Sequence, residues 1–352
     1  MHRLVESARR RGRGRVLKGH HNTNYVLRVG VGLAVLLGAM PLARLKYRVP
    51  LETIEVVPRI WAREADVLDV VCRYLSEVPR CLAVLGERGE RSLHAYLAGK
   101  ALSERNPDGA VDDQLMRAFA AFFVRTAQVP AHELPERPDG WPQDGDSEGF
   151  LDWLIDFAEH HVHRPNRHRF GRLFDDVGIP EEAMEVFRKE HRGLTPRPFR
   201  LLHTDVHRAN VIVRGEELAV IDWELATFGD PLHDLATHMV RMGYDAGERA
   251  RMTELWAQAM LAAGCGDLTK GMEADLPVYV DFEYAQSVFT DVMRAALALP
   301  SDPQEEHFRS AARRVTRALE LAQRPLGLAR VRGAERVVTA LRDWHGASVV
   351  SQ

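Results

Sequence analysis

Polar residues that could carry out chemistry gather between positions 203 and 234, beside short apolar runs. They are His203, Asp205, Asn210, Asp222, Asp230 and Asp234. Asn210 directly precedes the run Val211–Val213, and Asp222 directly follows the run Leu218–Ile221. A carboxylate at the end of a buried strand is costly unless it is paired or bound to a metal. Two such strands in one hairpin would bring the amide and the carboxylate together, and their oxygens suit Mg²⁺. Asp205, in the loop that enters the hairpin, would face whatever this metal holds.

The elements that must position these residues fall into two parts behind a basic tail. Residues 1–15 are rich in arginine and are predicted to be a flexible tail. Residues 16–97 indicate a twisted sheet with one helix over 60–75, where apolar residues recur at helical spacing. Residues 98–352 are mainly helical, interrupted by three short strands within 200–222. The sequence therefore predicts an α+β protein with a small sheet-rich lobe and a larger helical lobe.

The polar residues belong to a longer motif. It comprises His203, Thr204, Asp205 and Asn210, then Ile221–Glu224, Gly229–Pro231, Asp234 and Leu235. This motif resembles that of the aminoglycoside phosphotransferase and choline kinase family. The likeness is dense over residues 203–235 and extends more weakly, in the same order, over about residues 15–300. It implies a bilobal protein-kinase-like fold, with a small antiparallel-sheet N-lobe that clamps ATP and a mainly helical C-lobe that carries the catalytic loops.

The resemblance implies a role for each residue of the motif. Asp205 would be the catalytic aspartate that accepts the proton of the substrate hydroxyl, and His203 would support the loop backbone. Asn210 and Asp222 would hold the Mg²⁺ that bridges the ATP phosphates. Asp234 would tie the loop down through hydrogen bonds. The other interpretation is that these residues only cap and turn the chain, but so many of them beside two buried strands favour catalysis.

The small lobe must also hold ATP. Apolar and basic residues alternate over 42–49, which places Lys46 on one face of a strand. By the resemblance, Lys46 would contact the phosphates and pair with Glu64 on the following helix. Arg44 and Arg48 share the face of Lys46, so either could take its place.

Two further segments would contact the nucleotide. The loop over residues 19–24, with Gly19 and Asn24, would lie over the phosphates, although a plain hairpin turn explains it as well. Residues 94–99, including Tyr96, would form the hinge between the lobes, where backbone groups bind adenine.

A polar stripe marks a candidate acceptor site on the predicted helix 279–299. Its residues are Glu283, Gln286, Ser287, Thr290, Asp291 and Arg294, which share one helical face. Such a face could bind a hydroxylated or amino-bearing ligand, or it could be a solvated face with an Asp291–Arg294 pair. Glu224, beside the metal site, would also border the acceptor.

Composition limits the class of protein. Apolar residues make up 45% and charged residues 28%, as in ordinary globular proteins. Net charge is −3, yet the first 48 residues contain a single acid, Glu6, so the remainder is acidic and mildly favours a cationic acceptor. Three scattered cysteines indicate a cytoplasmic setting. The apolar segment 29–43 is shorter than the roughly 20 residues of a membrane span, and no specific nucleic-acid surface is expected.

These observations predict an ATP- and Mg²⁺-dependent kinase that phosphorylates a hydroxyl of a small molecule. An aminoglycoside or other antibiotic is one candidate acceptor, and resistance would follow from its modification. A metabolite such as choline, homoserine or a nucleoside is an alternative. A pseudokinase that binds nucleotide without chemistry is a third reading, against which the presence of Asp205, Asn210 and Asp222 counts. The oligomeric state is left open.

Overall fold

The computed structural model forms two compact units. It describes residues 15–18, 22–28, 31–37, 44–50, 57–86, 91–214 and 217–350. Unit 1 comprises the described residues of 15–50, 59–140 and 198–269, and unit 2 comprises those of 57–58, 141–197 and 270–350. The predicted boundary between the two lobes, after residue 97, stays a prediction, because unit 1 contains segments from both sides of it.

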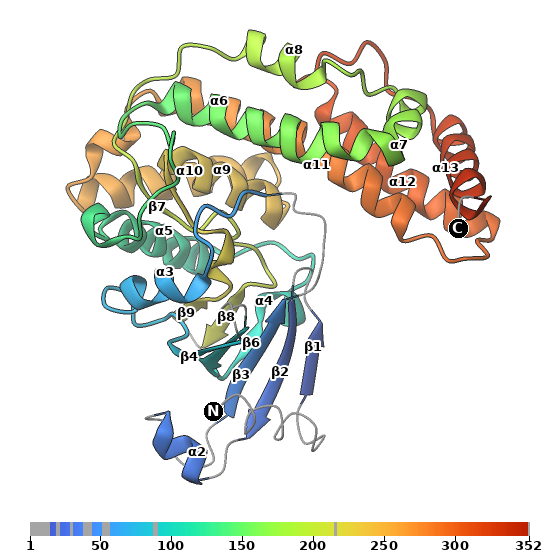
Figure 1. Ribbon diagram of the computed structural model, residues 1–352. Helices are drawn as coiled ribbons and strands as arrows, with labels where there is room; N and C mark the ends of the chain where they lie inside the picture. Colours follow the sequence, from blue (N-terminus) through green and yellow to red (C-terminus); the bar gives the residue numbers. More distant parts are fainter. Residues whose placement is uncertain are drawn as a thin grey trace. The chain divides into compact units, whose positions relative to one another are not determined.

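Unit 1 contains a five-stranded antiparallel sheet with the order β1-β2-β3-β5-β4 (Figure 1). Its strands are β1 (Arg15–Lys18), β2 (Asn22–Arg28), β3 (Arg44–Pro50), β4 (Cys81–Leu85) and β5 (Arg91–Ala95). Side chains alternate between the two faces of a strand. Leu45 and Tyr47 of β3 are therefore buried in an apolar core with Leu93, and Lys46 and Arg48 share the opposite face. This alternation matches the sequence pattern over residues 44–49, and residues 42–43 lie outside the described residues.

Two helices accompany this sheet in the chain. They are α2 (Val31–Leu36) and α3 (Glu64–Val71). The predicted helix over 60–75 is shorter in the structure and begins at Glu64. Trp61, which precedes it, is buried outside the helix, and its indole nitrogen donates to the carbonyl of Pro135 at 3.1 Å. Val67, Leu68 and Val71 form the buried side of α3.

The motif residues lie between short strands of unit 1. These are β6 (Lys100–Ala101), β7 (Arg200–Leu202), β8 (Val211–Arg214), β9 (Glu217–Val220) and β10 (Thr227–Gly229). Strands β6, β8 and β9 form one antiparallel sheet, and β7 pairs with β10. The β8–β9 hairpin pairs Val211 with Val220, so Asn210, just before β8, and Asp222, two residues after β9, lie at the same end of the hairpin.

The helices of unit 1 surround these strands. They are α4 (Leu102–Arg105), α5 (Asp113–Ala127), α9 (Pro231–Met242) and α10 (Ala246–Ala262), with short 3₁₀ turns at Ala131–Glu133, Trp223–Leu225 and Gly266–Thr269. Helix α9 has strong end signals. The Asp230 side chain accepts a hydrogen bond from the Leu232 amide at 3.0 Å, Pro231 occupies the first turn, and Gly243 ends the helix at φ 72°.

Unit 2 is helical throughout its described regular structure (Figure 1). Its helices are α6 (Ser147–Phe157), a π-helical turn (Ala158–His163), α7 (Arg164–Val177), α8 (Ala183–Glu190), α11 (Met272–Leu297), α12 (Glu305–Ala322) and α13 (Ala334–Val350). Aromatic side chains form much of its core: Phe174 packs edge-on against Phe289, and Phe187 lies 6.0 Å from Phe282 between ring centroids. Among the described residues, no helix is long and apolar enough to cross a bilayer.

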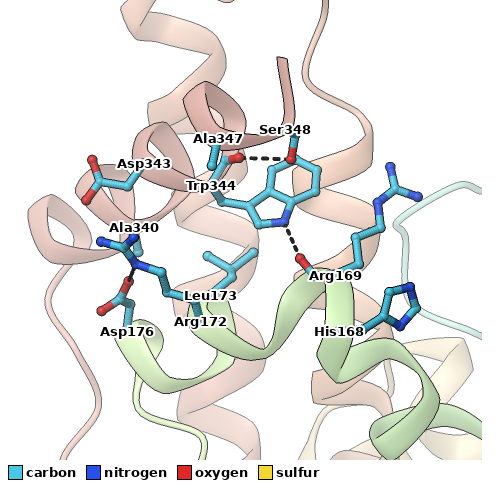
Figure 2. Close-up of a pocket in the computed structure, with 10 residues that line it drawn as sticks. All are labelled: His168, Arg169, Arg172, Leu173, Asp176, Ala340, Asp343, Trp344, Ala347 and Ser348. Atoms are coloured by element: carbon cyan, nitrogen blue, oxygen red, sulfur yellow. Dashed lines mark hydrogen bonds and ion pairs between the residues drawn. The ribbon is translucent and has the colours of Figure 1, made fainter. Parts of the chain in front are cut away.

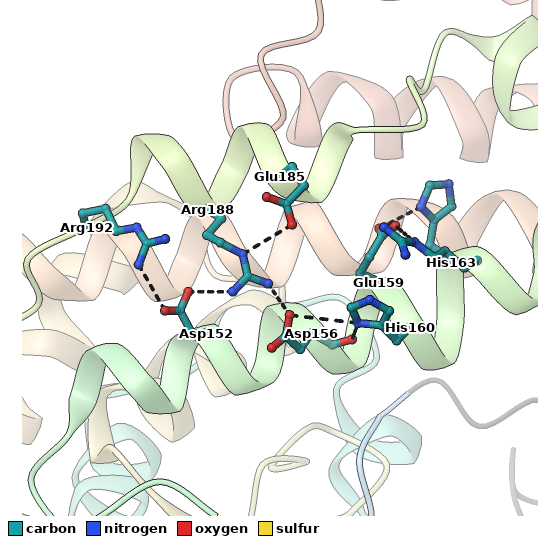
Figure 3. A network of polar contacts seen from close by, with 9 residues as sticks. Asp152, Asp156, Glu159, His160, His163, Glu185, Arg188 and Arg192 are labelled. Carbon is teal, nitrogen blue, oxygen red and sulfur yellow. Dashed lines mark hydrogen bonds and ion pairs between the residues drawn. The ribbon is translucent and has the colours of Figure 1, made fainter. Parts of the chain in front are cut away.

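Ion pairs connect α6 with the α8 region in unit 2 (Figure 3). The Arg188 guanidinium donates to Asp152 at 3.0 Å and also contacts Asp156. Arg192 reaches Asp152 at 3.1 Å. Figure 3 shows these arginines projecting from one segment toward acids of the other, so the network fixes α8 against α6 through partly exposed contacts.

A groove of about 550 Å³ lies between α7 and α13 (Figure 2). The Trp344 indole stacks on Phe170 at 5.3 Å, and its Nε1 donates to the Arg169 carbonyl at 3.0 Å. Arg172 and Asp176 approach within 3.7 Å along the same wall. None of the residues that the sequence predicts for catalysis lines this groove.

Candidate active site

One carboxylate holds the backbone of the loop that follows β7. Asp234 of α9 accepts hydrogen bonds from the backbone nitrogens of His203 at 2.9 Å and Thr204 at 2.8 Å. Thr204 has a positive φ of 57°, which is uncommon for a non-glycine residue, costs energy and persists only where the surrounding structure imposes it. The Thr204 hydroxyl donates to the Leu225 carbonyl at 2.7 Å, so the loop conformation is fixed at several points.

The Asp205 side chain at the end of this loop is held by both of its oxygens. Asn210 donates through Nδ2 to Oδ2 at 2.7 Å and to the Asp205 carbonyl at 3.1 Å. Arg241 donates through Nη1 to Oδ1, and His207 Nε2 lies 3.5 Å from the same oxygen. Burial alone would raise the pKa of Asp205, but Arg241 and His207 hold it well below its usual value. Asp205 is therefore a carboxylate at physiological pH.

Asp222 occupies the strained position that follows β9. Its φ is 72°, in the left-handed region that aspartate tolerates better than most residues. Backbone strain of this kind is concentrated at functional sites. The next amide, that of Trp223, donates to Glu64 Oε1 at 2.8 Å, which connects this turn to α3.

A buried cluster of charges surrounds Asp222. Arg48 contacts Glu64, and its Nη2 lies 2.7 Å from Asp222 Oδ1 and 2.7 Å from Glu224 Oε2. Arg59 reaches Glu224 at 2.9 Å. Burial would raise the pKa of Glu64, but Arg48 and its other cationic neighbours lower it to about 2. Three carboxylates thus share the Arg48 guanidinium, which the nearby acids keep protonated by raising its pKa despite burial.

The partner of Glu64 in the structure is Arg48 and not Lys46, the residue that the sequence favoured. The reason is that a planar guanidinium with five N–H donors can bridge several carboxylates at once, which a single ammonium cannot do. Lys46 lies two residues earlier on the same face of β3. Burial lowers its pKa, while Asp222 and Glu64 act in the opposite direction. Both cations therefore face the acidic cluster, and the phosphate-binding role of Lys46 stays a prediction.

The donor set around Asp222 suits a magnesium ion. Asn210 uses its amide nitrogen for the hydrogen bonds to Asp205, which leaves its oxygen as the group that would ligate a metal. Asp222 Oδ1 is buried and makes an ion pair with Arg48 without hydrogen-bond geometry. Among the described residues, no group of three or more His, Cys, Asp or Glu side chains is placed to hold a metal. A metal here would thus need phosphate oxygens as well, as Mg²⁺ commonly does.

The remaining nucleotide-binding residues stay predictions, and the structure describes two of the three. Asn24 pairs in register with Arg48 across β2 and β3, and its buried Oδ1 accepts no hydrogen bond from the described residues. Gly19 lies outside the described residues. Tyr96 follows β5, and its backbone nitrogen donates to the Arg44 carbonyl at 3.3 Å. These contacts are compatible with an adenine-binding hinge, which stays a prediction.

Sequence reasoning missed two residues near these groups. His94 is buried, pairs in register with Lys46, and its Nε2 lies 3.6 Å from Glu64. Burial lowers the pKa of His94 to about 4. Arg241 contacts Asp205 from α9. A signal for Arg241 was present, because it lies seven positions after Asp234 and therefore on the same helical face.

The predicted acceptor residues divide between the two units. Glu224 lies in the Arg48 cluster of unit 1 and is paired there with Arg48 and Arg59. The α11 stripe belongs to unit 2, and most of it is not a solvated face: Glu283 and Thr290 are buried, although Arg294 is exposed. Other members of the stripe, Gln286, Ser287 and Asp291, are half-buried. The Gln286 amide donates to Glu283 at 2.8 Å. An acceptor role for this stripe stays a prediction.

We expect the free energy of unfolding to fall when the pH is lowered from 7 to 5. Burial lowers the pKa of His203 and His238 to about 4 and that of His233 to about 3. In the unfolded chain these groups titrate near 6.5, so between the two values unfolding takes up protons and acid favours it. Each histidine contributes a loss of about 2 kcal/mol at pH 5. Asp234, whose pKa burial raises to about 6, offsets part of this loss.

Urea unfolding at pH 7 and pH 5 would measure this change. The His238→Gln variant should show a weaker dependence on pH, because His238 is neutral in the folded protein and Gln does not titrate. Equal stability at both pH values would contradict the prediction.

The architecture and the site define a class of protein: an α+β phosphotransferase with a protein-kinase-like fold. The chain belongs to the phosphotransferase enzyme family, whose model matches residues 15–273. The family that the motif resembles is therefore confirmed, as are the α+β protein-kinase-like fold class and the prediction of a phosphotransferase enzyme.

Solved structures show the same fold at low sequence identity. A choline/ethanolamine kinase family protein from Mesorhizobium loti is 17% identical, with a TM-score of 0.52 over 94% of this chain and 93% of that chain. The GDP complex of aminoglycoside 2'-phosphotransferase-IIIa is 16% identical, with a TM-score of 0.53 over 89% and 92%. The amicoumacin kinase hAmiN, in complex with AMP-PNP and Ca²⁺, is 12% identical, with a TM-score of 0.53 over 92% and 96%.

A sequence match reaches a curated enzyme over a short stretch. A thiamine kinase of Escherichia coli strain SMS-3-5 is 37% identical over an alignment of 79 residues, and the match covers 19% of this chain. The match spans only 29% of the length of that enzyme.

Proposed function

We propose that this phosphotransferase moves the γ-phosphoryl group of ATP to a hydroxyl of a small molecule, with Mg²⁺ as cofactor. The observation that supports it best is a pair of contacts in unit 1. Asn210 donates a hydrogen bond to the Asp205 carboxylate, and Arg48 forms ion pairs with both Asp222 and Glu64. Phosphoryl transfer depends chiefly on positioning of the reactants and on neutralisation of charge on the phosphate oxygens, and these groups could supply both.

In this proposal each group has a defined task. Asn210 and Asp222 would hold Mg²⁺, which would neutralise the phosphate oxygens when bound. Lys46, on the face of β3 that it shares with Arg48, presents positive charge for the remaining phosphate oxygens. The acceptor oxygen forms a bond to the γ-phosphorus, the bond to the β,γ-bridging oxygen breaks, and ADP leaves. Asp205, ionised at physiological pH, orients the hydroxyl and accepts its proton.

The acceptor that we propose is a hydroxylated molecule with cationic groups. The buried Glu283 and the half-buried Asp291 on α11 are acids that such a ligand could meet. An aminoglycoside or another antibiotic is the first candidate, in which case the protein confers resistance. A metabolite is the second candidate, of the choline, homoserine or nucleoside type. The short match to a thiamine kinase adds thiamine, a cationic alcohol, to this group.

The direct test is a mass-spectrometric screen of antibiotic and metabolite alcohols with Mg-ATP, looking for a mono-phosphorylated product. Expression in a susceptible bacterium, tested against a panel of antibiotics, separates the first candidate from the second. A protein that binds ATP and phosphorylates nothing, including water, would instead be the nucleotide-binding pseudokinase.

We expect Glu283→Gln to raise the KM for a cationic acceptor by about tenfold, since a hydrogen bond to a charged group contributes about 1.5–3 kcal/mol. The KM for ATP should change much less, because the proposed partner of Glu283 is the acceptor. Steady-state kinetics with both substrates would measure the two constants. Glu306→Gln is a matched control at an exposed position of α12. An equal rise for both variants, or none for Glu283→Gln, would remove α11 from the acceptor site.

A further inference from the structure

One face of helix α9 contacts the backbone of the loop over residues 203–206, which carries Asp205. Asp234, His238 and Arg241 lie at positions i, i+4 and i+7, so the same side of the helix presents all three. The Asp234 carboxylate accepts hydrogen bonds from two backbone amides, those of residues 203–204. His238 Nδ1 lies 2.9 Å from the carbonyl oxygen of Val206. The helix thus forms hydrogen bonds to the loop backbone on both sides of Asp205.

Arg241 extends this row to the Asp205 side chain. Its Nη1 donates to Oδ1 of Asp205, while Asn210 Nδ2 donates to Oδ2 at 2.7 Å. A carboxylate that is held through both oxygens cannot rotate without losing a charge-assisted hydrogen bond. Asn210 follows the loop and Arg241 comes from a separate helix, so the carboxylate is fixed between two elements.

The contact is sheltered from water, which makes it a strong constraint. The Asp205 side chain is 15% exposed and the Arg241 side chain 26% exposed. Removing one member of such a pair leaves the other charge without compensation. Arg241 also sits in the last turn of a helix with defined ends, at Asp230 and Gly243, so its backbone has little freedom to follow a moving loop.

We propose that Arg241 is a positioning residue that holds the Asp205 carboxylate in the orientation that receives the acceptor hydroxyl. This inference rests on the proposed role of Asp205. It requires no contact of Arg241 with ATP or acceptor. Its effect on the rate would come from geometry, because a displacement of about 1 Å can cost about 100-fold in a reaction that depends on orientation.

The test is the kinetics of Arg241→Met and Arg241→Lys, with Mg-ATP hydrolysis as the assay so that water serves as the acceptor. We expect Arg241→Met to lower kcat by about 10- to 100-fold and to leave the KM for ATP within about twofold. Arg241→Lys, which keeps the charge, should recover part of the loss. Arg251→Met is the control, since the ion pairs of Arg251 with Asp113 and Glu254 are partly exposed; it should behave as wild type.

A double-mutant cycle with Asp205→Asn decides whether Arg241 acts through Asp205. Groups that work through each other are non-additive, so Arg241→Met should change kcat by less than about twofold once Asp205 is replaced. An equal loss in both backgrounds, or wild-type kcat in Arg241→Met, would overturn the inference. Full activity of Asp205→Asn alone would instead overturn the proposed function.

A second variant tests the inference if Arg241→Met does not fold. If Arg241→Met is unstable, added guanidinium should restore kcat in Arg241→Ala, because the small cation can occupy the space of the lost group. Restoration in Arg241→Ala but not in Asp205→Asn supports positioning. A stable Arg241→Ala protein that guanidinium does not rescue counts against it.

Discussion

Replacing Asp222 with alanine is expected to lower kcat for phosphoryl transfer by about 100-fold or more, since removal of one group that stabilises transition-state charge typically costs this much. The substitution takes away the carboxylate proposed to hold Mg²⁺. The fold should survive, because Arg48 keeps its contacts with Glu64 and Glu224. The measurement is steady-state turnover of Mg-ATP over a wide range of Mg²⁺ concentrations, together with a thermal unfolding curve.

The control for this variant is Asp113→Ala. Asp113 is an exposed acid of α5 that pairs with Arg251 and Arg117, and its loss should leave turnover unchanged. If Asp222→Ala turns over Mg-ATP at the wild-type rate, the metal assignment is wrong. A variant that regains full activity at high Mg²⁺ would instead show that Asp222 contributes affinity for the metal without being indispensable.

Replacing Arg48 with methionine is expected to lower the free energy of unfolding by about 3–5 kcal/mol, the usual result of removing one partner of a buried ion pair. The Arg48 side chain is 7% exposed, and its loss would leave Glu64, Asp222 and Glu224 facing one another. The KM for ATP should rise as well, because the three carboxylates that lose their shared cation would repel the phosphates. Denaturant unfolding and steady-state kinetics measure the two effects.

Arg63→Met is the matched control for Arg48→Met. Arg63 pairs with Asp66 at the start of α3, but the Arg63 side chain is exposed and that of Asp66 half-exposed, so the pair should contribute only about 0–1 kcal/mol. The double variant Arg48→Met with Glu64→Gln should be more stable than Arg48→Met alone, since it removes one uncompensated charge. Equal stabilities of Arg48→Met and Arg63→Met would mean that the buried cluster contributes little to folding.

The Arg48 cluster also bears on how ATP is held. Lys46 and Arg48 both face the acids around Asp222, and Arg48 is the one that makes the ion pairs. Lys46→Met should therefore change stability less than Arg48→Met does. We infer a division of labour in which Arg48 organises α3 against the Asp222 turn and Lys46 remains available for phosphate.

The sequence alone was enough to predict most of what depends on order along the chain. The alternation over 42–49 is a local property of a strand, and it placed Lys46 and Arg48 on one face correctly. Asn210 and Asp222 flank two apolar runs, so a hairpin was bound to bring them to one end. The family motif between 203 and 235 was likewise readable, because its spacing reflects turns and strand ends.

Tertiary structure decided which of these groups touch. Spacing places side chains on a face, but it does not set the distance between two elements, and that distance selected Arg48 over Lys46 as the partner of Glu64. It also brought Arg241 from α9 to Asp205, a contact between residues 36 positions apart. The burial of polar side chains on α11 could not be predicted from the sequence either, since a polar stripe has the same helical period whether it faces water or protein. Local periodicity is encoded by neighbours in the chain, whereas contacts depend on packing between elements.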